Sequence, residues 1–279
     1  MNSSAFRLSE AERARRYDLL VQATALPEAP LLTEAALRLL LDLAGTPRVP
    51  EESRAELHQL IAAGLADNDG RLVPDAADIV EVMRQPAIWL RIEAIAGQRL
   101  GTWKAWLSEQ RAVIVIQSGV VDHYVLRTAV PGWVPVAAIR WLGVGPRDTL
   151  AGRPVLPMAT LLRWLDDPAT SLPGDSLPGD SVPGDDARFG GDPVLAAIWA
   201  QPGQLWAVDV EPGAGRVLVL DAAEAGLWRV SADDADDTAA LTPLPPRTFW
   251  RLLLTLIARA SETANAGQSA VATRSDGLL

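Results

Sequence analysis

The chain contains no cysteine and only two histidines, His58 and His123. Without a thiol it can form no disulfide, has no cysteine nucleophile and cannot bind zinc or an iron–sulfur cluster through thiolates. Two histidines are also too few for a histidine-rich metal centre. We therefore expect neither a metal nor any other cofactor.

Positive charge is scarce as well. Lys104 is the only lysine, and 25 basic residues face 35 acidic ones, which gives a formal net charge of −10. Proteins that bind nucleic acids need clustered lysine and arginine to neutralise phosphates. Nucleic acid is therefore not an expected partner.

Long apolar runs are missing too. Residues 1–20 are rich in charge and hold no apolar stretch suited to a signal peptide. The longest strongly apolar segment, residues 249–258, contains Arg251 and has about half the length of a membrane span. We therefore expect a cytoplasmic protein without membrane insertion.

The chain nevertheless has the apolar content of a globular protein, because 49% of its 279 residues are hydrophobic. Residues 1–30 are polar and are expected to form an N-terminal extension. After it, apolar residues at helical spacing predict three helices, at 33–44, 51–64 and 74–83.

The pattern changes after Pro86 from helical spacing to alternation. An alternating run at 88–94 and three more strand-like runs, at 99–107, 111–117 and 121–128, predict four strands. Strands joined by such short connections must be antiparallel neighbours. A further helix is predicted at 134–142.

The second half of the chain repeats this order. The Gln-Pro dipeptide at 85–86 recurs at 201–202, and the offset of 116 residues lines up a helix, four strands and a final helix. We predict an internally duplicated α+β fold whose two halves, 31–145 and 146–262, form one domain.

A linker rich in proline, glycine and aspartate interrupts the second half at 168–192. Within it, residues 171–185 repeat a pentapeptide three times, as SLPGD, SLPGD and SVPGD. Proline and glycine at such regular intervals cannot sustain a helix or strand and favour a solvated linker. Its aspartates are spaced more widely than those of calcium-binding loops. Residues 263–279 are expected to form a tail.

Only one group of residues resembles a catalytic constellation, namely Ser118, Asp122 and His123. Neighbouring residues of a strand point to opposite faces, so Asp122 cannot orient His123 as a general base. The acidic run 233–237 is expected to be a solvated turn rather than a metal site. We therefore predict no catalytic residue and no enzymatic activity.

Tryptophans on the predicted strands indicate a protein-binding surface. Trp106 alternates onto the polar face of its strand with Lys104, and Trp89 also lies on the polar face of its own strand. The alternative is that helices cover both faces and these tryptophans belong to the core. The candidate protein-binding residues are Trp89, Arg99, Lys104, Trp106, Leu205 and Arg229.

The order of these features resembles the EspG family, cytosolic chaperones of type VII (ESX) secretion in actinobacteria. The similarity extends over about residues 31–260. It is carried by LTEAALRLLLDLAGTPRVP, LIAAGLADNDGRLVPDAADIVEVMRQP and RAVIVIQSG in the first half, and by PGQLWAVDV, GRVLVLD and FWRLLLTLIA in the second.

This resemblance implies a quasi-twofold α+β fold with a central, mostly antiparallel sheet and two flanking helical bundles. It also implies that the protein binds the hydrophobic tip of the PPE subunit in a PE–PPE heterodimer, keeps that cargo soluble and targets it for export. Two other classes remain open at this point. One is a small hydrolase with an active site across the two halves, and the other is an acidic immunity or scaffold protein.

Overall fold

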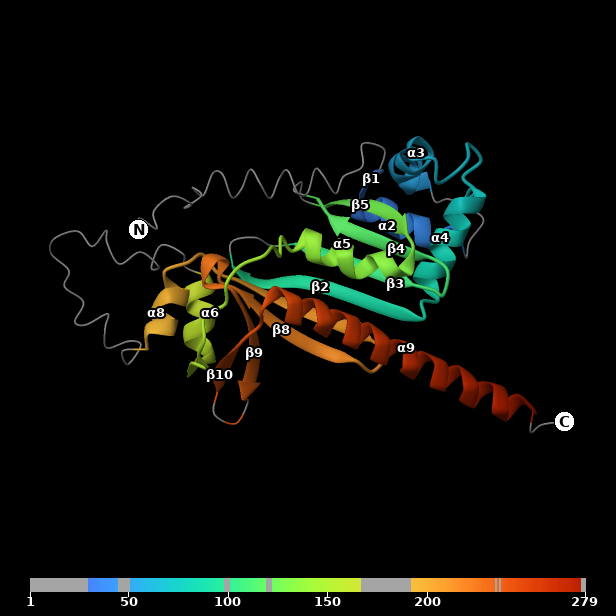
Figure 1. The fold of residues 1–279 in the computed structure, drawn as a ribbon. Coiled ribbons are helices and arrows are strands. Elements are labelled where there is room, and N and C mark those ends of the chain that lie inside the picture. The colour runs from blue at the N-terminus through green and yellow to red at the C-terminus, as the bar shows by residue number, and fades with distance from the viewer. Residues whose placement is uncertain are drawn as a thin grey trace. The chain divides into compact units, whose positions relative to one another are not determined.

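The computed structural model describes residues 30–44, 51–97, 101–118, 122–166, 192–233, 235 and 237–276 (Figure 1). Over these residues the protein is α+β, with seven α-helices and one large antiparallel sheet, as the sequence predicts. The chain divides into two compact units. Unit 1 comprises Met1–Trp89 and Trp103–Val144, and unit 2 comprises Leu90–Thr102 and Gly145–Leu279.

Ten strands lie in the described ranges. They are β1 (Leu31–Thr33), β2 (Ile88–Gly97), β3 (Thr102–Leu107), β4 (Ala112–Gln117), β5 (His123–Ala129), β6 (Val155–Pro157), β7 (Gln204–Glu211), β8 (Gly215–Asp221), β9 (Leu227–Asp233) and β10 (Thr238–Pro243). Their hydrogen-bonded order is β1-β5-β4-β3-β2-β7-β8-β9-β10-β6. Consecutive strands from β2 to β5 and from β7 to β10 are neighbours, as expected for strands joined by short turns.

The helices precede and follow these runs of strands. They are α2 (Glu34–Asp42), α3 (Arg54–Ala62), α4 (Pro74–Arg84), α5 (Val134–Trp141), α6 (Met158–Asp166), α8 (Pro193–Trp199) and α9 (Pro246–Asp276). Both α4 and α8 begin with proline, whose fixed backbone torsion and missing N–H suit the first helical position.

In unit 1, a junction at Thr33 holds the start of α2. The Thr33 hydroxyl oxygen accepts a hydrogen bond from the Ala36 N–H at 3.2 Å, which caps the helix. The Gln59 side-chain oxygen of α3 accepts hydrogen bonds from the Thr33 N–H and hydroxyl, each at 3.1 Å. One side chain therefore ties α3 to the point where β1 becomes α2.

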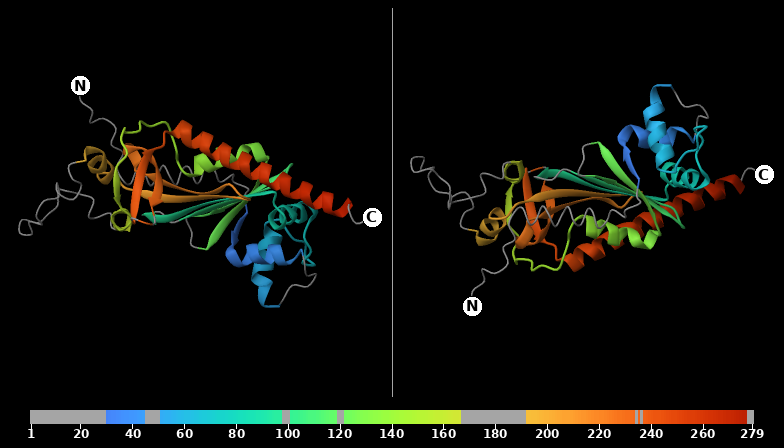
Figure 2. Two further views of the ribbon diagram at one scale, coloured as in Figure 1. Left: turned by 90° about the horizontal axis from the view of Figure 1, so that it is seen from below. Right: turned by 90° about the horizontal axis from the view of Figure 1, so that it is seen from above.

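The core of unit 1 lies between α2, α3, α4 and one face of β4 and β5. Its fully buried members include Leu40, Leu60 and Val80 from the helices and Val113 from β4. Figure 2 shows α5 on the other side of these strands. Because both faces are covered, β4 is apolar along nearly its whole length instead of alternating.

The core of unit 2 joins α6 and α8 to the strands β7 to β10. Leu161 of α6, Ile198 of α8 and Trp228 of β9 are fully buried in it. The rings of Trp164 and Trp199 stack with their centroids 4.7 Å apart. Helix α9, which also belongs to unit 2, contacts β7. Its buried residues recur at helical spacing, at Phe249, Leu253, Leu256 and Ala260.

Most predicted elements are confirmed, with some differences at their ends. The third strand begins at Thr102 in the described residues, later than the predicted start at residue 99. Helix α9 continues to Asp276, although the sequence analysis expected a tail from residue 263. The expected extension 1–29 and most of the linker 168–192 lie outside the described residues. No helix among the described residues is long and apolar enough to span a membrane.

Among the described glycines of unit 2, Gly203 has the closest side-chain neighbours. A Cβ atom at this position would lie 2.3 Å and 2.6 Å from ring atoms of Trp164 and 2.7 Å from Leu165. We expect Gly203→Ala to lower the free energy of unfolding by about 1–3 kcal/mol because the stacked tryptophan must move. Urea unfolding measures the change. Gly145→Ala is the control, since its Cβ would meet nothing within 4 Å. Equal stability of the two variants would contradict the prediction.

Candidate protein-binding site

The predicted residues of unit 1 that the structure describes are all half-buried. Trp106 is partly buried and packs against the apolar cluster formed with α2, α3 and α4. Lys104 lies two positions earlier on the same face of β3, opposite Val115 of β4, and is half-buried. Trp89 is half-buried in β2. Lys104 therefore lies beside a tryptophan that contributes to the core of unit 1.

The predicted residues of unit 2 lie on opposite faces of its strands. Leu205 is 1% exposed and belongs to the cluster with α6 and α8. Arg229 is exposed, and it pairs with Val219, one position away from Leu220, the partner of Leu205. Alternation along β8 therefore separates Leu205 from Arg229. Arg99 lies outside the described residues.

Of Ser118, Asp122 and His123, the first and last are joined by a backbone hydrogen bond. The Ser118 N–H donates a hydrogen bond to the His123 carbonyl oxygen at 2.7 Å. Asp122 has a left-handed backbone, with φ of 59°, and its side chain is exposed. The described part of the chain contains no group of three or more His, Asp or Glu side chains that could hold a metal ion.

Unit 2 also contains a cluster of ion pairs that the sequence did not predict. The Arg91 guanidinium of β2 donates to the Asp209 carboxylate of β7 at 3.1 Å, and Arg216 of β8 approaches Asp209 at 3.7 Å. Asp209 is only 13% exposed. The three residues come from three strands, so spacing along the sequence does not reveal their contact.

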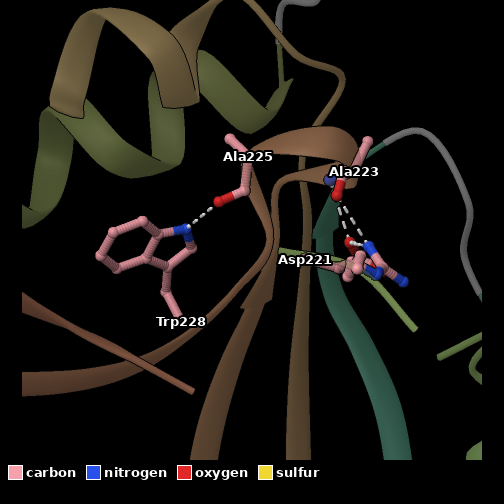
Figure 3. A network of polar contacts seen from close by, with 5 residues as sticks. Asp221, Ala223, Ala225 and Trp228 are labelled. Atoms are coloured by element: carbon pink, nitrogen blue, oxygen red, sulfur yellow. Dashed lines mark hydrogen bonds and ion pairs between the residues drawn. The ribbon is translucent and has the colours of Figure 1, made fainter. Parts of the chain in front are cut away.

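A second polar network lies within unit 2. The Arg147 guanidinium donates to the Asp221 carboxylate at 2.5 Å and 3.3 Å and to the Ala223 carbonyl at 2.9 Å. Nearby, the Trp228 indole N–H donates to the Ala225 carbonyl at 3.1 Å (Figure 3). Both ends of the network stabilise the connection between β8 and β9, which indicates a structural role.

Arg127 of β5 differs from these paired arginines. Its Nε and Nη2 atoms are buried and have no hydrogen-bond partner among the described residues. Burial away from water lowers the pKa of this guanidinium from its usual value. Tyr124 of the same strand has a raised pKa, first because of burial and then because of the charges of Glu34 and Asp122.

No protein-family model matches the chain, and no curated protein matches it.

The bond between Arg147 and Asp221 leads to a stability prediction. Both side chains are less than one-fifth exposed, so Asp221→Asn leaves a half-buried guanidinium without its counter-charge. We expect the free energy of unfolding to fall by about 1.5–3 kcal/mol, measured by urea unfolding.

The matched control is Arg216→Met, which removes a longer contact from a side chain that is 52% exposed. Its expected effect is below about 1 kcal/mol. A smaller loss for Asp221→Asn than for Arg216→Met would contradict the structural role of the Arg147 network.

Proposed function

We propose that this protein is a cytoplasmic chaperone of type VII (ESX) secretion that binds the PPE subunit of a PE–PPE heterodimer. The observation that supports it is a repeated strand–helix junction in units 1 and 2. This repetition favours an internally duplicated α+β fold, which is the architecture implied by the resemblance to the EspG family.

Each junction contains an aspartate with a left-handed backbone directly before the last strand of its unit. Asp122 has φ of 59° and Asp237 has φ of 49°. The carbonyl of Asp122 accepts a hydrogen bond from the Glu34 N–H at 3.1 Å, and that of Asp237 accepts one from the Met158 N–H at 2.9 Å. Glu34 and Met158 are the first residues of α2 and α6, so the two bonds are equivalent.

Two further pairs of hydrogen bonds repeat. The Leu126 N–H donates to the Pro30 carbonyl at 3.4 Å, and the Leu241 N–H donates to the Pro154 carbonyl at 2.9 Å. Each proline directly precedes the short strand β1 or β6. Where the final helix of each unit begins, Trp133 N–H donates to the Val130 carbonyl and Thr248 N–H to the Pro245 carbonyl.

These pairs also refine the predicted offset. Asp122 and Asp237 are 115 residues apart, as are Leu126 and Leu241, instead of the 116 that separate the two Gln-Pro dipeptides. The offset therefore falls by one residue between the Gln-Pro dipeptides and the two aspartates, and a single offset does not hold along the whole repeat. The backbone hydrogen bonds therefore support a duplication more clearly than sequence identity does.

A chaperone of this kind works without covalent chemistry. Covering an apolar tip removes its surface from water, with a gain of about 25 cal/mol per Å² of apolar area. An interface of about 800 Å² per partner is typical of specific complexes. Binding would therefore keep the exposed tip from aggregating until the cargo is exported.

Co-expression tests the proposed function. We expect a PE–PPE pair encoded beside this gene to become soluble and to elute with the chain as a 1:1:1 complex in size-exclusion chromatography. The same pair expressed without the chain is the control. The proposal fails if no such pair binds or becomes soluble.

The response to salt distinguishes the chaperone from an acidic immunity or scaffold protein. An interface dominated by an apolar tip should survive about 1 M NaCl, whereas an interface between opposite charges weakens steeply as the salt concentration rises. A complex that dissociates in high salt would favour the acidic binding protein.

Lys104 allows a test of the predicted contact residues. It is the only lysine, so an amine-reactive cross-linker can attach only there and at the N-terminal amine. We expect a cross-link to PPE in the complex that Lys104→Arg abolishes. An intact complex without this cross-link would place Lys104 outside the interface.

A further inference from the structure

Helix α9 is far longer than α5, the helix that begins at the matching turn of unit 1. Helix α5 has eight residues and is followed by Gly143 with a left-handed backbone, whereas α9 has 31 residues. In unit 2, Thr263 already lies at the turn between β7 and β8, since a Cβ atom at Gly213 would be 3.1 Å from its side chain. From there α9 continues to Asp276 (Figure 1). The arrangement that the two units share therefore does not require the full length of α9.

The second half of α9 has little packing to support it. The buried residues of the helix end at Ala260, and no side chain described at 261–266 is buried. The following sequence contains Gly267 and several serine and threonine residues, which are poor helix formers. A helical segment of this kind is marginal in water unless something packs against it. A second helix lying alongside would supply part of that packing.

One side of α9 carries a stripe of exposed residues. Arg251, Leu254, Ala258 and Glu262 follow one another at intervals of three or four positions, so they share one face of the helix. All four are exposed, and Leu254 is a large apolar side chain that is 42% exposed. We call these four residues the α9 stripe. It lies on the side of the helix away from the buried residues.

The charges of the α9 stripe are separated along the helix. Residues 246–261 contain three arginines and no acidic residue, and Glu262 is the first carboxylate. Glu262 lies 11 positions after Arg251, which is about 17 Å along the axis, so the two cannot pair within one helix. Among the residues that the structure describes, neither side chain forms an ion pair. A second copy of the helix, running in the opposite direction, would complement both charges.

We propose that the α9 stripe binds the α9 stripe of a second copy of this chain, with the two helices antiparallel. A two-fold axis beside residues 256 and 257 brings Arg251 of each copy to Glu262 of the other, so the dimer contains two equivalent ion pairs. Leu254 of each copy packs against Ala258 of the other, where the small side chain leaves room. Parallel helices would place arginine against arginine, so the charges select the antiparallel orientation. The inference concerns the free chain and does not rest on the proposed function.

The expected dimer is reversible. Specific complexes typically bury about 800 Å² per partner, and a stripe of about three helical turns offers less than that. We therefore expect the wild type to pass from monomer to dimer as its concentration rises, measured by sedimentation velocity. A chain that stays monomeric at every concentration would overturn the inference.

Exchange of the two charges tests the contact. Arg251→Glu and Glu262→Arg each place like charges opposite one another and should raise the dissociation constant of the dimer at least about 10-fold. The variant that carries both substitutions restores opposite charges and should return to within about threefold of the wild type. Arg54→Glu is the control, because it makes the same change of charge at an exposed ion pair of unit 1 and should leave association unchanged.

The result of this exchange decides whether the stripe is the interface. All the substituted positions are exposed, so we expect every variant to keep the melting temperature of the wild type within a few degrees. A dimer that both single variants leave intact would place the interface elsewhere. A double variant that stays as weak as the single variants would overturn the pairing of Arg251 with Glu262.

The absence of cysteine allows a test of orientation, because an introduced cysteine is then the only thiol. In the antiparallel dimer the two copies of residue 258 lie about 5 Å apart along the axis, and the two copies of residue 247 about 28 Å apart. A short bismaleimide should therefore link two Ala258→Cys chains but not two Arg247→Cys chains. Parallel helices would be linked at both positions, and that result would overturn the inference.

Discussion

The fold depends on strands that must be buried on both faces. In β4 five consecutive residues are buried, and β7 begins with five more, so neither strand tolerates water on either side. The connections within each run of strands are too short to hold an α-helix. Cover can therefore come only from chain before the first strand or after the last one. This constraint explains why helices lie at both ends of each run of strands.

The periodic elements could be predicted from the sequence, but their partners could not. Alternation and other strand-like runs located β2 to β5, proline marked the start of α4, and the repeat offset located α8. Strands β1 and β6 have three residues each, too few for a period, and they exist only because β5 and β10 supply a neighbour. Likewise, the polar sequence after residue 262 lacks apolar residues at helical spacing and was predicted to be a tail. Helix α9 nevertheless continues through it to Asp276.

The candidate site shows the same limit. Alternation correctly separated buried from polar positions on β3, yet it could not tell that Trp106 packs under helices while Arg229 is exposed. Arg127 was overlooked because a single arginine in a strand normally reaches water. The sequence does show that residues 123–147 around it contain no aspartate or glutamate. Only the structure shows that individual nitrogen atoms of Arg127 are buried.

The position of the pentapeptide repeat has a consequence for how this protein can vary. The three copies lie between α6 and α8, inside the loop that is closed when β6 pairs with β10. The entropy cost of joining two chain ends grows only with the logarithm of the number of residues between them, so a change of five residues in chain length costs at most a few tenths of a kcal/mol. A change in the number of copies would thus have little effect on the free energy of folding. The number of copies can therefore vary between related sequences without loss of the fold.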